Sequence, residues 1–236
     1  MGEKFNEADI KKAFLNNESV FGDIGDSVIV YEKAICRGHT IMDIMLCTQR
    51  KGLIGVEIKT EIDTTRRLNK QLQDYEKVCD YVYVLCHDSH VEAVDTILKR
   101  YGHAHVGIIC YSAFKGQPFF GVYKVAQRSP YKKSFHTLDI LWKTEIQTLL
   151  GTFAHYSRHI QEETGLTAQD TKTRQGGVGG LAIKSVYSNK MRKGQLIQEL
   201  INRVGEQEAT NIFCDIFINN RNHPEKSIKL THFNPK

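Results

Sequence analysis

The chain has 236 residues, of which 41% are hydrophobic and 25% charged, with 32 lysines and arginines against 27 aspartates and glutamates. This balance supports a buried core and excludes a disordered chain. No apolar run reaches the roughly 18 to 20 residues that cross a bilayer, and the N-terminal segment lacks the apolar centre of a secretion signal. We therefore expect a globular, cytoplasmic protein with no membrane partner.

The charge is unevenly distributed along the chain. Residues 1–130 contain 17 basic and 17 acidic side chains, whereas residues 131–236 contain 15 basic and 10 acidic ones. The positive surplus therefore lies in the second half, as in a module that approaches a polyanion such as nucleic acid. Solubility alone explains such an excess equally well.

Helix and strand patterns alternate through the first part of the chain. Apolar spacing predicts a helix over residues 6–15, and β-branched or alternating runs predict strands at 27–34, 40–47 and 53–59. A helix over 64–79 follows, with Asp63 placed to cap its start. The next elements are a strand at 81–86, a helix at 91–100, a strand at 106–111 and an edge strand at 119–126. A meander followed by crossover helices indicates an α/β fold with a mixed sheet.

The pattern changes near residue 129. We expect a helix over Leu138–Leu150 that contains the only tryptophan, Trp142, then a flexible basic and glycine-rich loop at Lys172–Gly180. Apolar residues from Leu196 to Val204 form the stripe of an amphipathic helix. These features divide the chain into a core, residues 1–128, and a mostly helical, basic C-terminal region, residues 129–236.

Three charged residues stand out in two neighbouring predicted strands. Glu57 and Lys59 lie two residues apart on an alternating strand, so they share one face. Asp43 interrupts an apolar run, where an unpaired carboxylate is costly unless it meets a metal or a cation. If the turn between the strands has an odd number of residues, such as Gln49–Lys51, Asp43 faces Glu57 closely enough for both carboxylates to bind one divalent ion. A two-residue turn would place them on opposite faces.

This pattern resembles the PD-(D/E)XK nuclease superfamily. The matching residues are Asp43, thirteen intervening residues, and the sequence Glu57-Ile58-Lys59. The order of elements is similar to the αβββαβ restriction-endonuclease-like core of these enzymes. In the next helix Gln71 and Tyr75, spaced i and i+4, reproduce the QxxxY element of the RecB-like branch.

The stretch from residue 56 to residue 86 looks most like small, largely uncharacterised bacterial and phage members of this superfamily. The resemblance covers roughly residues 5–125, and the helix around Trp142 more loosely. One departure is that Ile41 and Met42, and no proline, precede Asp43. Proline is often absent at this position in relatives of the superfamily.

The resemblance implies a metal site. Asp43, Glu57 and the main-chain carbonyl of Ile58 would coordinate Mg²⁺ or Mn²⁺, because hard oxygen ligands suit these ions. Glu32 matches an acidic position on the preceding strand and would hold or orient a second ion. The metal would neutralise charge that develops on the phosphoryl oxygens.

The resemblance also implies catalytic roles for three further residues. Lys59 would orient or help deprotonate the attacking water and stabilise the pentavalent phosphate. Gln71 and Tyr75 would position the metal site or the nucleic-acid backbone, and Arg67, one turn earlier, would reach a phosphate. The reaction would be phosphodiester hydrolysis.

Other sites in the sequence are weaker. Cys86, His87 and His90 cluster after a strand but lack a fourth zinc ligand at a recognisable spacing. The stretch from 190 to 204 resembles, weakly, the DNA-contacting helices of SAP-like modules, and packing of its apolar face on the core explains it at least as well.

We therefore expect a metal-dependent nuclease that acts on DNA, with a homodimer or an accessory protein among its partners. One alternative is a catalytically silent nucleic-acid-binding or adaptor protein with a nuclease fold. Another is a defence effector whose nuclease is gated by a partner.

Overall fold

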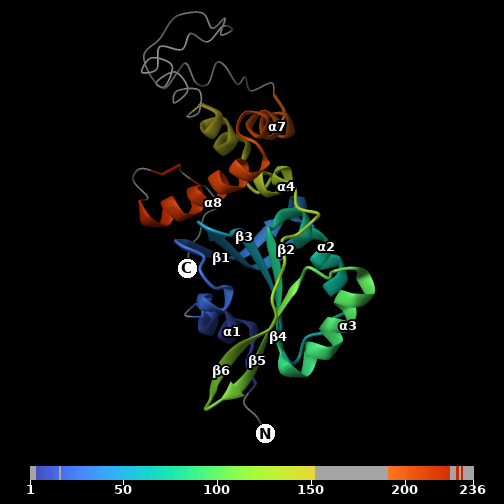
Figure 1. Cartoon of the computed structure of the whole chain (residues 1–236). Coiled ribbons are helices and arrows are strands. Elements are labelled where there is room, and N and C mark those ends of the chain that lie inside the picture. Colours follow the sequence, from blue (N-terminus) through green and yellow to red (C-terminus); the bar gives the residue numbers. More distant parts are fainter. Residues whose placement is uncertain (1–3, 16, 152–190, 224–226, 229, 231–236) are drawn as a thin grey trace, which may run out of the picture.

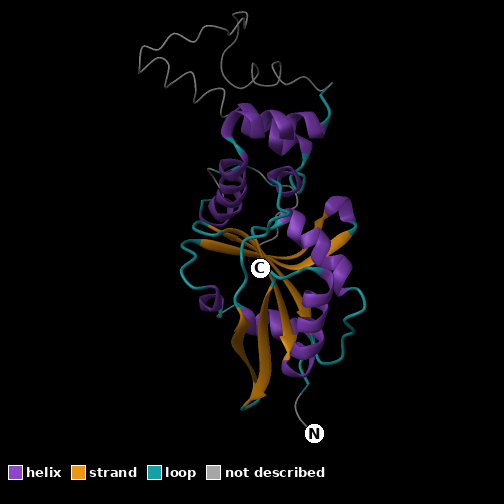
Figure 2. Cartoon of the chain, turned by 45° about the vertical axis from the view of Figure 1, so that its right-hand side comes forward, coloured by secondary structure: helices purple, strands orange, loops and turns teal. Residues whose placement is uncertain are grey.

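The computed structural model describes residues 4–15, 17–151, 191–223, 227, 228 and 230. The predicted loop at 172–180 lies outside these residues. The described part forms a six-stranded sheet with helices on both faces (Figure 1, Figure 2). In chain order the elements are α1 Glu7–Phe14, η1 Glu18–Phe21, β1 Ser27–Ile35, η2 Cys36–Gly38, β2 Thr40–Thr48, β3 Gly52–Lys59, α2 Leu68–Val78, β4 Tyr81–His87, η3 Asp88–His90, α3 Val91–Tyr101, β5 Gly107–Phe114, β6 Gln117–Lys124, α4 Ser134–Leu138, α7 Lys193–Val204 and α8 Glu206–Asn222.

The strands lie in the sheet in sequence order, β1 to β6. β1, β2 and β3 pair antiparallel, β3, β4 and β5 pair parallel, and β6 returns antiparallel along β5. The helices α2 and α3 are the crossovers that parallel neighbours need. The mixed α/β fold with a helical C-terminal region is therefore confirmed, and each predicted strand is present.

Side chains from the sheet enter two hydrophobic cores. One core lies between the sheet and α2, α3, α4, α7 and α8, and the other lies between the sheet and α1 with η1. In β3, Ile54, Val56 and Ile58 belong to the core with α1, so Glu57 and Lys59 point to the α2 face, as the alternating pattern predicts. The site residues of β3 thus lie beneath α2.

The predicted start of the second helix is wrong. α2 begins at Leu68, four residues after the predicted start, and its N-cap Arg67 makes no side-chain capping bond. The Asp63 carboxylate instead accepts hydrogen bonds from the backbone N–H of Thr60, at 2.8 Å, and from its hydroxyl, at 2.7 Å. Asp63 therefore closes a turn directly after β3, because short acidic side chains bond well to nearby backbone groups.

The helix predicted over 138–150 starts later than expected. α4 ends at Leu138, and a second helix runs from 143 to 151, the last residue described in that part of the chain. Trp142 lies exposed between them, and its backbone N–H donates to the Glu145 carboxylate at 2.6 Å. This contact is a helix-capping bond, which explains why the chain restarts a helix here.

In the part of the chain that is described, no helix has the length and apolar character needed to cross a membrane.

Candidate active site

The β2–β3 hairpin sets the register of the acidic residues. Its turn consists of Gln49–Lys51, between the paired residues Thr48 and Gly52. Pairing continues from there to Ile44 opposite Val56, so the next position brings Asp43 level with Glu57. The three-residue turn is the odd-numbered turn that a shared Asp43–Glu57 site requires.

At Asp43 the two strands stop pairing through their backbones. The Asp43 backbone N–H donates to the Tyr75 hydroxyl at 3.0 Å, and the Asp43 carboxylate accepts from the backbone N–H of Ile58 at 2.8 Å. Because the N–H and C=O of one residue in a strand point to the same neighbour, the Ile58 carbonyl also faces Asp43. The two groups expected to bind a metal therefore lie side by side.

Glu57 lies at the centre of the site. Only 1% of it is exposed. One carboxylate oxygen accepts from the Lys59 ammonium at 2.5 Å and the other accepts from the Tyr75 hydroxyl at 2.6 Å. Tyr75 thus links Glu57 to the backbone of Asp43, and the structure brings together four of the residues expected in the site.

Gly55 permits this close packing of α2 on β3. A Cβ atom at Gly55 would lie 2.8 Å from the Cys79 sulfur and 2.9 Å from a Tyr75 ring carbon. Real side chains do not approach so closely, so a larger residue would push α2 away. The glycine therefore sets the distance at which Tyr75 reaches Glu57.

The electrostatics of the site favour a bound cation. Burial, followed by the charge of Glu57, raises the pKa of Asp43 to about 7, against the lowering effect of the hydrogen bond from the backbone N–H of Ile58. Burial, with the charges of Glu57 and Asp43, also holds the pKa of Tyr75 well above its ordinary value, so Tyr75 remains a hydrogen-bond donor. Two facing carboxylates with one lysine leave negative charge that a divalent ion would neutralise.

The donor set suits Mg²⁺ or Mn²⁺. It comprises two carboxylates and the Ile58 carbonyl, which are hard oxygen ligands. Gln71 lies one turn before Tyr75 on α2, and its side-chain oxygen is buried without a hydrogen-bond partner among the described residues. Such an acceptor needs a donor, for example a metal-bound water. No group of three or more His, Cys, Asp or Glu side chains in the described ranges is arranged to hold a metal, so this site would rest on two acids.

The carboxylate of Glu32, expected to hold or orient a second ion, is bound to Lys11 of α1 in the structure. The backbone of Glu32 has a positive φ of 53°, and its carboxylate accepts from the Lys11 ammonium at 3.2 Å, with 67% of the side chain exposed. Glu32 lines a groove of about 440 Å³ between α1 and β1. Arg67 is exposed just before α2.

A residue that the sequence did not reveal is Glu7, in the first turn of α1. Its charge contributes to the raised pKa of Asp43, and it pairs with Lys11 at 2.6 Å. In the sequence Glu7 follows a helix-capping asparagine, a position where acids are common for local reasons. Only the packing of α1 on the sheet shows that Glu7 lies near the acidic pair.

Comparison with known families identifies the chain. The family described as bacteriophage P4 protein cII matches residues 1–207. The chain belongs to this family. No curated protein matches the sequence. Among solved structures, the SPO1766 protein of unknown function from Silicibacter pomeroyi is 15% identical, with a TM-score of 0.35 over 65% of this chain and 84% of the other.

Proposed function

We propose that this member of the bacteriophage P4 protein cII family is a metal-dependent nuclease that hydrolyses phosphodiester bonds of DNA. The observation that carries the proposal is the meeting of Asp43 and Glu57 at the point where β2 leaves β3, with Lys59 bound to Glu57. Buried acids with a raised pKa are common at catalytic sites.

The residues of the chain have distinct tasks in this reaction. Asp43, Glu57 and the Ile58 carbonyl would hold the metal, which when bound supplies Lewis-acid stabilisation of the phosphoryl oxygens. Lys59 is 7% exposed and is held by Glu57, so its ammonium stands ready to orient the attacking water or pair with a phosphate oxygen. Tyr75 orients Glu57, and Gln71 offers a free acceptor on the same helix face.

The choice of DNA rests on the resemblance to PD-(D/E)XK nucleases and on the basic surplus of the chain. The net charge of +5 favours a polyanionic substrate. A cytoplasmic location and a homodimer or an accessory protein as partner are further parts of the proposal.

The decisive experiment is a cleavage assay on supercoiled plasmid and on labelled single-stranded and branched DNA, with Mg²⁺, Mn²⁺ or EDTA. Wild type should cleave only with metal, and Asp43→Asn, Glu57→Gln and Lys59→Ala should each lose on the order of 100-fold or more in rate. Glu32→Gln is the matched control and should keep its activity, because Glu32 binds Lys11.

Cleavage that persists in EDTA, or that survives Glu57→Gln, would contradict the proposal. If wild type binds DNA but cuts none of these substrates, the adaptor and the gated effector become the better explanations. One observation favours the adaptor: both oxygens of Glu57 already have partners within the protein.

A further inference from the structure

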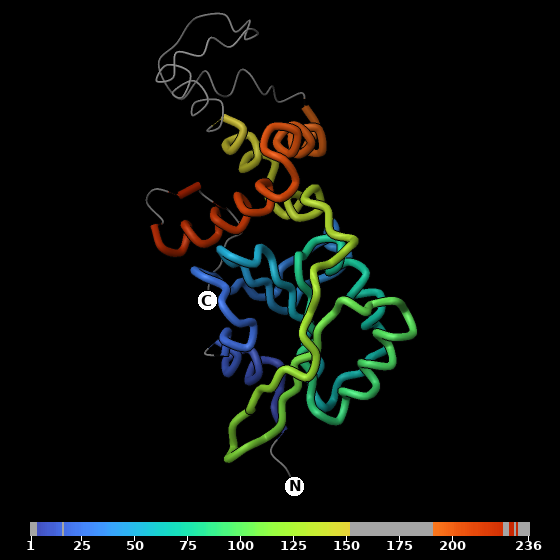
Figure 3. The backbone as a smooth tube through the Cα atoms, in the orientation of Figure 1, coloured from blue at the N-terminus to red at the C-terminus, as the bar shows by residue number. Residues whose placement is uncertain are grey.

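The β5–β6 hairpin ends in a tight turn that projects from the sheet (Figure 1, Figure 3). Phe114 pairs with Gln117, and Lys115 and Gly116 between them both have positive φ, of 50° and 74°. Two residues with positive φ form the turn type whose twist matches that of paired strands. The hairpin tip is therefore a regular, well-formed structure at the edge of the sheet.

Two aromatic rings are exposed at this tip. Phe114 is 60% exposed and Phe119 is 66% exposed. Their ring centroids lie 6.4 Å apart, and the Lys115 ammonium lies 5.3 Å from the centroid of the Phe114 ring. Exposed apolar residues on an edge strand favour aggregation, so their presence needs a reason. Two exposed phenylalanines with a lysine beside them therefore indicate a binding surface.

The surrounding segment has no negative charge. From residue 96 to residue 138 the sequence contains no aspartate or glutamate, whereas it contains seven lysines and arginines. Tyr123, on β6 of the same hairpin, is also exposed. Basic residues interleaved with exposed aromatic rings are the composition of surfaces that bind single-stranded nucleic acid.

The tip lies on the same face of the sheet as the candidate active site. Lys59, Cys86 and Cys110 are aligned across the parallel strands β3, β4 and β5. Phe114 is four residues beyond Cys110, so it shares the face of Lys59. Standard strand spacing places it about 13 Å further along and about 10 Å across from Lys59. A few nucleotides of a bound strand would span this separation.

We propose that Phe114 and Phe119 stack on the bases of single-stranded nucleic acid, and that the hairpin thereby directs a single strand or a strand junction toward Asp43 and Glu57. The proposed stacking on bases depends only on the hairpin. The proposed guidance of the strand toward Asp43 and Glu57 rests on the proposed nuclease function. Base faces are free to stack on aromatic rings only in a single strand, which is why duplex DNA is not the ligand of this surface.

The test is fluorescence anisotropy in EDTA, which removes any cleavage. Wild type and Phe114→Leu/Phe119→Leu are titrated with a labelled oligothymidylate and with an abasic oligonucleotide of equal length. Since aromatic stacking on one base is worth roughly five- to a hundredfold in affinity, the double variant should bind oligothymidylate at least fivefold more weakly. Its affinity for the abasic strand should not change, because that strand has no bases.

Tyr101→Leu is the matched control. Tyr101 is also exposed, and the Arg100 guanidinium lies 5.5 Å from its ring centroid, so this variant loses an equivalent ring and cation pair elsewhere. It should bind both oligonucleotides as wild type does. Leucine retains apolar bulk at the exposed positions, and therefore folding is not at risk.

Three outcomes overturn the inference: unchanged oligothymidylate binding by the double variant, equal losses for both oligonucleotides, or an equal loss in Tyr101→Leu. If the double variant binds oligothymidylate as wild type does but differs from it in molecular mass by sedimentation, the two rings form a contact between copies of the chain, which also overturns the inference. The titration contains no metal and is therefore independent of cleavage. Stacking confirmed in it, together with no cleavage in the separate assay with Mg²⁺ or Mn²⁺, would count against the nuclease and leave the proposed hairpin surface intact.

Discussion

The raised pKa of Asp43 implies that the stability of the protein depends on pH. In the folded protein Asp43 holds its proton up to about pH 7, whereas in the unfolded chain it releases the proton near its ordinary value of about 4. The folded state therefore binds more protons between these values, and Asp43 lowers stability progressively as pH rises through this window. Asp43→Asn removes this cost, so without metal it should stabilise the protein at pH 8 by up to about 4 kcal/mol.

Urea denaturation in EDTA at several pH values measures the effect. The difference in unfolding free energy between Asp43→Asn and wild type should be largest at pH 8 and shrink toward pH 5. Mg²⁺ should then raise the stability of wild type and leave Asp43→Asn unchanged, because ligand binding to the folded state stabilises it. A constant difference across pH would show that Asp43 is ionised without penalty.

Tyr75 joins both acidic residues, so its hydroxyl should matter more than its ring. Tyr75→Phe removes the donor to Glu57 and the acceptor for the Asp43 backbone N–H. Leaving such buried groups unpaired should cost about 1 to 3 kcal/mol of unfolding free energy. Tyr111→Phe is the control, since it removes a buried hydroxyl that makes no such pair of bonds. Equal losses in thermal unfolding of the two variants would refute the bridging role.

The sequence predicts the central residues of the site because strand periodicity fixes them. Glu57 and Lys59 share a face by alternation, and Gln71 and Tyr75 share one by helical spacing. Glu32 could not be placed in this way, because its positive φ of 53° turns the side chain out of the regular alternation of β1. Glu7 could not be found at all, since nothing local relates α1 to Asp43.

At the scale of elements, buried strands were the most predictable. The strands β1 to β4 are rich in apolar residues and end at clear turns, so their bounds follow from composition. Helix ends were harder to predict, because they depend on local contacts: Asp63 closes a turn after β3, and Glu145 caps the start of a helix. The helix α8 was not predicted individually, although Phe213 and Phe217, at i and i+4, mark its apolar stripe.

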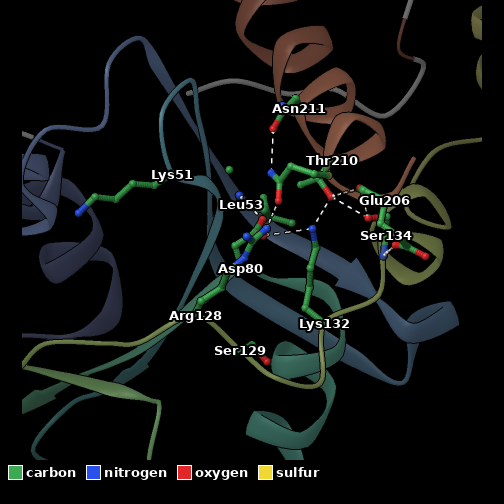
Figure 4. A network of polar contacts seen from close by, with 12 residues as sticks. Lys51, Leu53, Asp80, Arg128, Ser129, Lys132, Ser134, Glu206, Thr210 and Asn211 are labelled. Atoms are coloured by element: carbon green, nitrogen blue, oxygen red, sulfur yellow. Dashed lines mark hydrogen bonds and ion pairs between the residues drawn. The ribbon is translucent and has the colours of Figure 1, made fainter. Parts of the chain in front are cut away.

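A polar network joins the C-terminal helices to the sheet (Figure 4). Asp80 is 1% exposed and accepts from the Leu53 backbone N–H at 3.0 Å, from Arg128 at 2.9 Å and from Lys132 at 3.2 Å. Arg128 also bonds to Gln207, and Lys132 bonds to Thr210, both on α8. One buried carboxylate thus holds two cations that reach α8.

We expect Asp80→Asn to destabilise the protein by about 3 to 5 kcal/mol, because it leaves cations near a buried site without their counter-charge. Asp95→Asn, which breaks the pair with the exposed Lys99, should lower the unfolding free energy much less, because ion pairs with a solvent-exposed partner contribute little to stability. Chemical denaturation of both variants measures the contrast. A small effect at Asp80 would mean that the network adds little beyond the packing of α8.

Over the whole molecule, the C-terminal helices complete a core that begins in the N-terminal strands. Phe213 and Phe217 of α8 belong to the same buried cluster as Val28 and Met45 of the sheet. Lys33 of β1 is also buried, and its pKa falls to about 8 through burial, despite the nearby charge of Glu145. The division at residue 128 therefore follows a change in sequence pattern, whereas the packing continues across it.

This shared core predicts that residues 1–128 do not form a stable unit by themselves. Without α8 the strands would expose Val28, Met45 and Cys47, which are almost fully buried in the whole chain. In the full chain, Phe213→Ala should lower the unfolding free energy by about 3 to 5 kcal/mol, as for other buried aromatic residues. The protein should still unfold in a single transition, at a lower midpoint temperature. Ile62→Ala, at an exposed apolar position, should leave that transition unchanged. A fragment 1–128 that unfolds cooperatively at the temperature of the full chain would contradict this view and show that these residues form an independent domain.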